Sequence, residues 1–111
     1  MGKKGDKQTN ASAESAENLQ DKLFPLGEIR LKKMFGGHGV FYEETMFSLV
    51  DSKGTVFFKV DDSNKHRFED AGAEKHGRMP YYQVPEQILS NDKTLQEWAK
   101  VSVDIAVRGK K

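Results

Sequence analysis

The chain contains no cysteine, which excludes disulfides, thiolate metal sites, iron–sulfur clusters and a cysteine nucleophile. It also lacks an apolar run near the roughly 20 residues that span a bilayer, and its N-terminus lacks the apolar segment of a signal peptide. A strong charge of one sign is missing too, because 18 Lys and Arg oppose 17 Asp and Glu, for a net charge of +1. We therefore expect a cytoplasmic protein without membrane contact, in which any nucleic-acid contact comes from a local basic patch.

The length of 111 residues is typical of a single domain, and 7 Phe, 3 Tyr and 1 Trp are available for its core. Residues 1–11 carry no large apolar side chain beyond Met1, so they predict a disordered N-terminal arm. Residues 108–111 are similarly polar and predict a frayed basic tail. The folded domain is therefore expected over residues 12–107.

The spacing of apolar residues changes several times along this domain. Ser12 or Ser15 can cap a first helix, which should end near Pro25 and Gly27. Runs rich in β-branched and aromatic residues predict an antiparallel meander over residues 29–35, 39–42, 45–50 and 55–60. Further elements are expected as a helix over 64–71, an edge strand over 79–85, a short turn through Leu89, and a last helix from Asn91 or Asp92 with Trp98 as core anchor. The predicted fold class is α+β: an antiparallel sheet of about four to five strands, with helices before, between and after it, packed mainly on one face.

Glycines follow the first predicted strand in the run Gly36-Gly37-His38-Gly39. A phosphate-binding loop would need Lys and Ser or Thr after the glycines, or a helix opening there, but Val40-Phe41-Tyr42 follows instead. Gly36, Gly37 and Gly39 therefore predict a tight structural turn that uses positive φ, and not a ligand site.

Recognisable catalytic and metal-binding patterns are missing from the sequence. His38, His66 and His76 have no metal-ligand spacing and fall in different predicted elements, and no Gly-x-Ser-x-Gly motif is present. We therefore expect no cofactor, no metal and no enzyme activity. A small metal-dependent or acid/base enzyme is a weaker alternative.

Two short segments suggest a binding surface. Arg78-Met79-Pro80-Tyr81-Tyr82 combines a guanidinium with two aromatic rings, which suits a protein interface or stacking on bases, although plain packing at an edge strand explains it equally well. Neighbouring strand residues point to opposite faces, and we expect Tyr82 to be the outward ring. A basic cluster in the first strand is more simply a solvated sheet face. The candidate partner-binding residues are Arg78, Tyr81, Tyr82, Arg30, Lys32 and Lys33.

Several segments together match a known family in order and spacing: Lys33 to Tyr42, Met46 to Val50, Phe58 to Asp62, Met79 to Pro85, and Trp98-Ala99. Over residues 15 to 107 the chain resembles the TfoX N-terminal domain. The resemblance implies an α+β fold and a link to the TfoX/Sxy regulators of natural competence, which work with the cyclic-AMP receptor protein at competence promoters. It supplies no catalytic residue. Those regulators carry a second, C-terminal domain, for which this sequence has no room after Lys111. We therefore expect a stand-alone N-terminal domain here.

The leading hypothesis is a non-enzymatic regulatory or adaptor domain that binds protein. By resemblance alone, its partner would be the transcription machinery or a regulator such as the cyclic-AMP receptor protein. The alternative is a nucleic-acid-binding module with weak direct DNA binding, and salt separates the two, because phosphate contacts weaken steeply with salt. A homodimer through the edge around Pro80 to Val84 is a further alternative, although prolines often blunt pairing at an edge.

Overall fold

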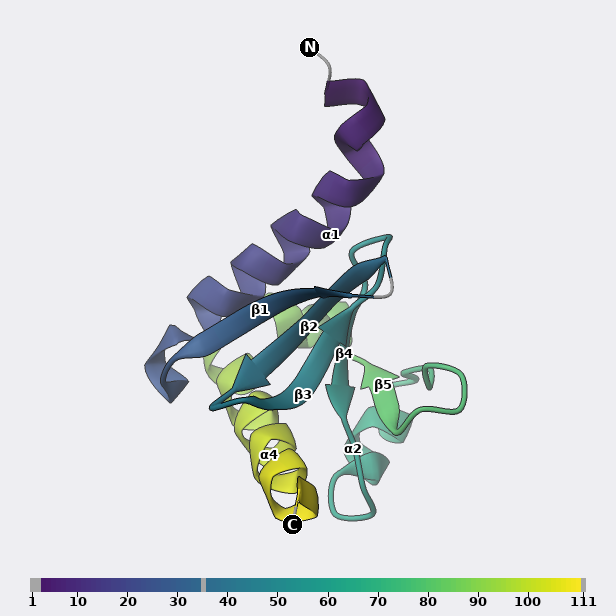
Figure 1. Cartoon of the computed structure of the whole chain (residues 1–111). Helices are drawn as coiled ribbons and strands as arrows, with labels where there is room; N and C mark the ends of the chain where they lie inside the picture. Colours follow the sequence, from purple (N-terminus) through teal and green to yellow (C-terminus); the bar gives the residue numbers. More distant parts are fainter. Residues whose placement is uncertain (1–2, 35, 111) are drawn as a thin grey trace.

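The computed structural model of the chain describes residues 3–34 and 36–110 (Figure 1). In chain order its elements are α1 (Lys3–Lys22), the 3-10 helix η1 (Phe24–Leu26), β1 (Ile29–Met34), β2 (Gly37–Tyr42), β3 (Thr45–Val50), β4 (Val56–Lys59), α2 (Lys65–Asp70), β5 (Tyr81–Gln83), α3 (Glu86–Leu89) and α4 (Asp92–Lys110). The strands form one antiparallel five-stranded sheet in the order β1-β2-β3-β4-β5. The predicted α+β class is therefore confirmed.

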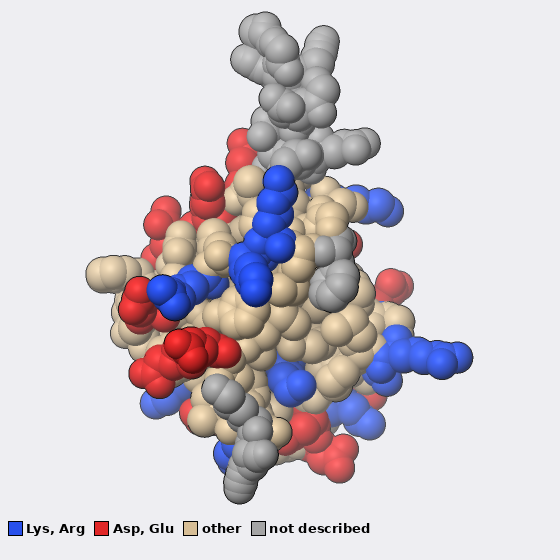
Figure 2. All heavy atoms as spheres, in the orientation of Figure 1, with Lys and Arg blue, Asp and Glu red and all other residues tan. Residues whose placement is uncertain are grey.

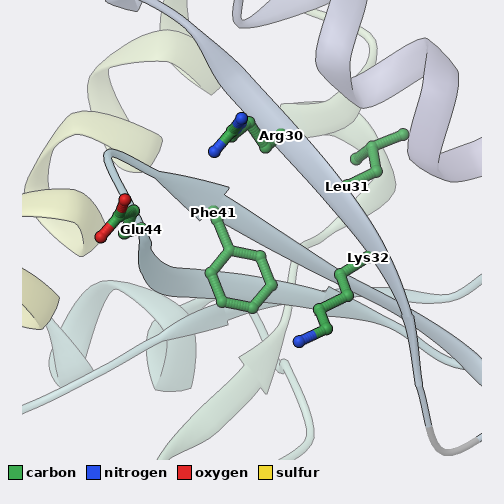
Figure 3. Close-up of a pocket in the computed structure, with 5 residues that line it drawn as sticks. All are labelled: Arg30, Leu31, Lys32, Phe41 and Glu44. Carbon is green, nitrogen blue, oxygen red and sulfur yellow. The ribbon is translucent and has the colours of Figure 1, made fainter.

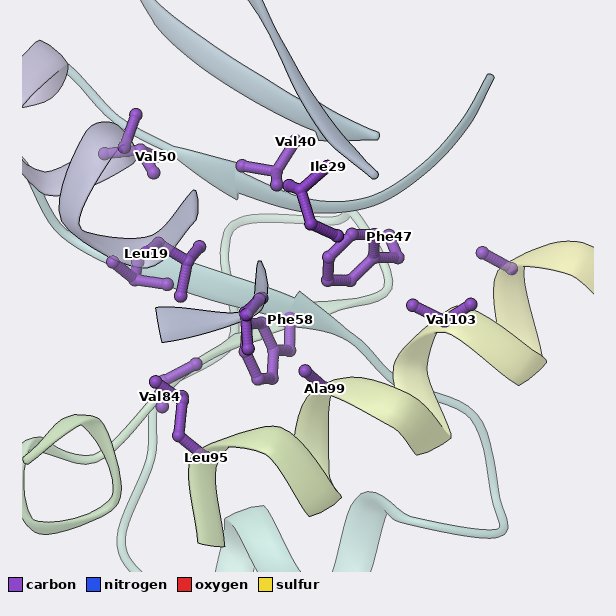
Figure 4. Close-up of a cluster of buried hydrophobic side chains, with 14 of the residues drawn as sticks. Leu19, Ile29, Val40, Phe47, Val50, Phe58, Val84, Leu95, Ala99 and Val103 are labelled. Atoms are coloured by element: carbon purple, nitrogen blue, oxygen red, sulfur yellow. The ribbon is translucent and has the colours of Figure 1, made fainter. Parts of the chain in front are cut away.

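One face of the sheet packs against α1 and α4, which pass behind it in Figure 1. Strand alternation directs Val40, Val50 and Phe58 to this helix-covered face, and all three are buried. The β2–β3 register shifts after Val40, leaving Phe47 as an extra residue, and this bulge adds the Phe47 ring to the same core. Figure 4 shows how side chains from the sheet, α1 and α4 meet there.

The last helix begins where its capping residue predicts. The side-chain oxygen of Asn91 accepts a hydrogen bond from the Thr94 backbone N–H at 3.1 Å, which satisfies one free donor of the first turn. Leu95 and Ala99 are the fully buried anchors of α4. Trp98, the expected anchor, is only half-buried: it packs edge-on against Phe68 at a centroid distance of 4.7 Å. The expected role of Trp98 is therefore corrected to a rim contact between α2 and α4.

Both long helices extend beyond the expected domain ends. Helix α1 begins at Lys3, so Ser12 and Ser15 lie inside it and the prediction that either caps it is wrong. Helix α4 continues to Lys110, past the expected start of the tail at residue 108. No proline interrupts either segment, so the backbone hydrogen bonds continue without apolar anchors. The order of both ends in solution stays a prediction, and residues 1, 2 and 111 lie outside the described residues.

Among the described residues, no helix combines the length and apolar character needed to cross a membrane.

Candidate functional site: the open face of the sheet

The second face of the sheet is uncovered over its first three strands. In the described part of the chain no helix lies on it, and Figure 1 looks onto it. Its four apolar side chains are half-buried, unlike the buried ones of the opposite face. Figure 2 shows this side as a largely uncharged surface, bordered by Lys and Arg and, on the left, by acidic side chains. We call this surface the open face and define it by Arg30, Lys32, Met34, Phe41, Met46 and Leu49.

Beyond β4 the loop over residues 73–80 pairs with the edge of β5 through Lys75 and Tyr82, and it places His76 and Met79 on the same side of the sheet as the open face. The His76 backbone N–H donates to the Tyr81 carbonyl oxygen at 2.8 Å, and the His76 ring meets Phe57 edge-on at a centroid distance of 4.5 Å. Phe57 and Tyr81 are buried, yet they lie outside the main core cluster. The loop therefore packs against Phe57 and leaves the β1–β3 part open.

A hollow of about 440 Å³ lies at the β1 side of the open face. Figure 3 shows the Phe41 ring at its centre, with Arg30 and Lys32 from β1 and Glu44 from the β2–β3 hairpin around it. Arg30 has one ion pair, a 3.9 Å contact with Glu28 in which both side chains are exposed and solvent weakens the attraction. Lys32 forms no ion pair within the described residues. The hollow thus combines an aromatic floor with accessible cations.

A second hollow of about 200 Å³ adjoins the loop, and its lining includes Met34, Met46, Leu49 and Met79. A Cβ placed on Gly39 would lie 2.9 Å from the Met46 sulfur and 3.0 Å from the Met34 sulfur, so both thioethers lie over this glycine. Methionine side chains are flexible and polarizable, and they adapt to irregular partners. This hollow can therefore change shape without a change in the backbone.

The titratable groups do not form a catalytic constellation in the described residues. No group of three or more His, Cys, Asp or Glu side chains is placed there to hold a metal ion. The Nδ1 atom of His76 is buried without a hydrogen-bond partner, beside Phe57. Burial raises the pKa of Tyr81, while the hydroxyl and backbone N–H of Ser63 lower the pKa of Asp61 by bonding its carboxylate. Both shifts follow from local packing and turn geometry.

The model of the TfoX N-terminal domain matches residues 21–106. The chain belongs to the TfoX N-terminal domain family. The DNA transformation protein TfoX1 of Aliivibrio fischeri is 36% identical over 62 residues, which cover 52% of this chain and 29% of that relative. The chain thus matches less than a third of the relative's length. All five strands of this TfoX N-terminal domain lie inside the family match.

In this TfoX N-terminal domain the predicted basic cluster is divided between the faces. Arg30 and Lys32 point to the open face, whereas alternation places Lys33 on the side of His38, whose ring bonds the Ser12 hydroxyl of α1 at 2.8 Å. Arg78 is exposed in the loop between α2 and β5. The structure therefore brings together only Arg30 and Lys32 from the predicted cationic residues.

The two tyrosines do point to opposite faces, but with the reverse of the expected parity. Tyr82 pairs with Phe58 and packs against Phe68 at a centroid distance of 6.0 Å, so it faces the helices. Tyr81 faces the other side and is only 4% exposed, and the Lys59 ammonium lies over its ring, 5.4 Å from the centroid. The expectation that Tyr82 is the outward ring is therefore wrong, and neither ring belongs to the open face.

The glycines of the predicted turn have two different roles. Gly36 has φ +77°, as expected for a tight turn between β1 and β2. Gly37 and Gly39 lie inside β2, so their expected turn role is wrong. At Gly37 a Cβ would collide with the Val50 carbonyl oxygen, and at Gly39 it would meet the methionine sulfurs. Backbone contact with β3 at Gly37 and side-chain contacts at Gly39, and not positive φ, therefore favour glycine at these two positions.

The sequence reasoning missed Phe41, Met46 and Leu49 as site residues. A signal was present, because residues 45–50 are apolar at both parities, and such a strand often has cover on both faces. Alternation alone could not indicate which face lacks its cover.

Proposed function

We propose that this TfoX N-terminal domain is a non-enzymatic regulatory domain of competence and transcription control, which acts by binding another protein on its open face. The observation that carries the proposal is the half-buried apolar surface of Phe41, Met46 and Leu49 on a sheet whose other face is closed. Contiguous exposed apolar surface on a soluble domain commonly marks an interaction site. The link to competence rests on the family and on the name of the A. fischeri relative.

The chemistry of the open face suits a protein partner. Phe41 lies in a hollow with Arg30, and interface hot spots are enriched in aromatic and arginine side chains. The methionines beside it supply an adaptable apolar contact. The face can therefore offer an anchor pocket and a polar rim, the arrangement of many protein interfaces.

Binding of nucleic acid is less well supported by the same residues. Arg30 and Lys32 are the only predicted cations on the open face, and Glu28 and Glu44 lie next to them. Affinity for phosphates depends on the number of charges neutralised, so two cations beside two carboxylates contribute little. Phe41 remains a surface on which a single base could stack, and a binding test with DNA separates this alternative.

A chimaera tests the function. The matching segment of A. fischeri TfoX1 is replaced by the corresponding residues of this chain, and transformation frequency is measured in a strain without its own TfoX1. We expect the chimaera to restore transformation and Phe41→Asp to reduce it about tenfold or more, because a buried charge without a partner destabilises an interface. Phe24→Asp is the matched control, since Phe24 is 76% exposed in η1, away from the open face.

Two outcomes would contradict the proposal. Failure of the wild-type chimaera at normal protein level would refute the competence role, and equal activity of the Phe41 and Phe24 variants would refute the role of the open face. Fluorescence anisotropy with labelled single- and double-stranded DNA at about 50 and 200 mM salt checks the alternative. Binding that needs Phe41 and weakens steeply with salt would identify a nucleic-acid-binding module instead.

A further inference from the structure

We propose that the partner of the open face is an acidic amphipathic protein segment, with an apolar side chain in the methionine-lined hollow and a carboxylate on Arg30 and Lys32. This inference rests on the proposed function. It concerns the chemistry of the partner, which the family match does not specify.

The arrangement of charge across the face carries the inference. Cations occupy one edge, where Arg30 and Lys32 are exposed on β1. The β2–β3 hairpin closes the end of the hollow next to Arg30, where Glu44 lines it beside Phe41, and Lys32 lies at the end away from the hairpin (Figure 3). An unsymmetrical field of this kind orients a charged partner and rejects the reversed direction. A segment with its acidic end at β1 fits this field.

The existing contacts of the two cations leave them available. The Arg30–Glu28 pair is long and exposed, so its attraction is largely screened by solvent. A partner carboxylate that binds the Arg30 guanidinium through two parallel hydrogen bonds would be a stronger acceptor. Lys32 has no ion pair in the described part of the chain. A partner carboxylate would therefore replace a weak ion pair at Arg30 and would displace no ion pair of the described residues at Lys32.

The strand register gives the spacing that the segment needs. Lys32 lies opposite Gly39, and Gly39 lies opposite Leu49, so two strand separations divide the cation from the apolar anchor site. With about 4.8 Å between neighbouring strands, the two positions are about 10 Å apart. Gly39 carries no side chain between them, and the space over it is lined by the edge of the Phe41 ring and by the movable Met34 and Met46 thioethers. A peptide segment that joins the two positions therefore crosses the sheet over Gly39, in contact with the Phe41 ring and the two thioethers.

The hairpin supplies a second, independent sign that charge matters here. Glu43 and Glu44 occupy the two central positions of the β2–β3 turn with φ of +47° and +70°. Asn-Gly is the sequence that this turn geometry favours, because left-handed conformations strain other side chains. Glutamates in this turn add a negative end to the open face at a cost in backbone strain.

A display experiment with the full chain tests the inference. A phage library of random peptides of about 16 residues, long enough to cross the face as a helix or strand, is selected on the immobilised chain. We expect the enriched peptides to combine Asp or Glu with Leu, Met or Phe, and to lose affinity about tenfold for the double variant Arg30→Glu, Lys32→Glu. Selection on that variant should instead enrich peptides rich in Lys and Arg.

Matched controls separate charge at the face from charge in general. The double variant Lys93→Glu, Lys100→Glu makes the same change in net charge on exposed positions of α4, and peptide affinity should stay within about twofold. Leu49→Asp should abolish binding by removing the anchor. Melting curves of every variant show that the fold is kept.

Each remaining outcome overturns the inference in a distinguishable way. Peptides that need Phe41 and Leu49 but ignore the Arg30 and Lys32 reversal would refute the acidic partner and keep the protein-binding function. Failure to enrich any peptide that depends on these residues would count against both proposals. Self-association that Phe41→Asp abolishes, measured by sedimentation, would make a second copy the occupant. Tight binding of oligo-dT at the same residues would show that the open face binds single-stranded DNA.

Discussion

The two faces of this sheet carry similar side chains and have different cover. Phe58 and Phe47 point to one face, where α1 and α4 bury both completely. Phe41 and Leu49 point to the other face and stay half-buried, because within the described residues only the loop over residues 73–80 reaches that side, through His76 and Met79. Apolar composition alone therefore does not tell a core from a binding surface. The difference is made by which elements pack on each face.

The largest effect should come from truncating one ring on each face. We expect Phe58→Ala to cost about 3–5 kcal/mol of unfolding free energy, because it leaves a cavity in a closed core, while Phe41→Ala should cost about 1 kcal/mol. Urea unfolding measures both. Similar losses for the two variants would mean that the open face is a second core.

The neighbouring tyrosines test the covered part of the second face. Tyr81→Ala should cost about 3 kcal/mol, because the ring is buried on this side of the sheet, and Tyr82→Ala should cost about 2 kcal/mol through its contact with Phe68. Urea unfolding again measures both. A nearly neutral Tyr81→Ala would show that the ring is not buried in solution.

Two glycines in β2 have different surroundings: backbone atoms lie close to Gly37, and side-chain atoms lie close to Gly39. Gly37→Ala should cost about 2 kcal/mol, because its Cβ meets the backbone of Val50 and Asp51, which cannot move aside. Gly39→Ala should cost about 1 kcal/mol, because its Cβ meets only side chains, the Phe41 ring and the Met34 and Met46 sulfurs, and side chains can shift more easily than backbone. Thermal unfolding with and without phosphate measures both variants. A phosphate-dependent loss at Gly37 would contradict the purely structural role.

The hairpin at the end of the open face should become more stable when its two glutamates are replaced by residues that favour positive φ. Replacing Glu43-Glu44 by Asn-Gly suits the positive φ at both positions, so we expect a gain of about 1 kcal/mol in unfolding free energy. Thermal unfolding monitored by circular dichroism measures the gain. A loss of stability would show that the glutamates make stabilising contacts in solution.

The smallest effect concerns acid stability at the turn before α2. Hydrogen bonds from Ser63 hold the pKa of Asp61 below its ordinary value of 3.8 in the folded state. Asp61 therefore stabilises the fold above that value, and the contribution is lost as pH falls below it. Asp61→Asn keeps the acceptor oxygen and should flatten the decline in unfolding free energy below about pH 4. Equal slopes for the wild type and Asp61→Asn would contradict this assignment.

Local signals were sufficient to place most elements of this domain. Strand periodicity, turn residues and the Asn91 cap located the sheet and the last helix, because these features depend on neighbours in the chain. The matched segments likewise indicated the correct family from the residues alone. The start of α1 was missed, because residues 3–11 lack the regularly spaced apolar side chains by which a helix is predicted from sequence.

The sequence by itself thus determined the α+β class, the strand order along the chain and the family. Only the tertiary structure decided which side of each strand is covered. Tyr82 faces the helices, Lys33 is separated from Lys32, and Phe41 belongs to the open face, because the packing of α1 and α4 sets the parity of the whole sheet at once. Alternation relates neighbours to each other, but only contacts between distant segments distinguish inside from outside.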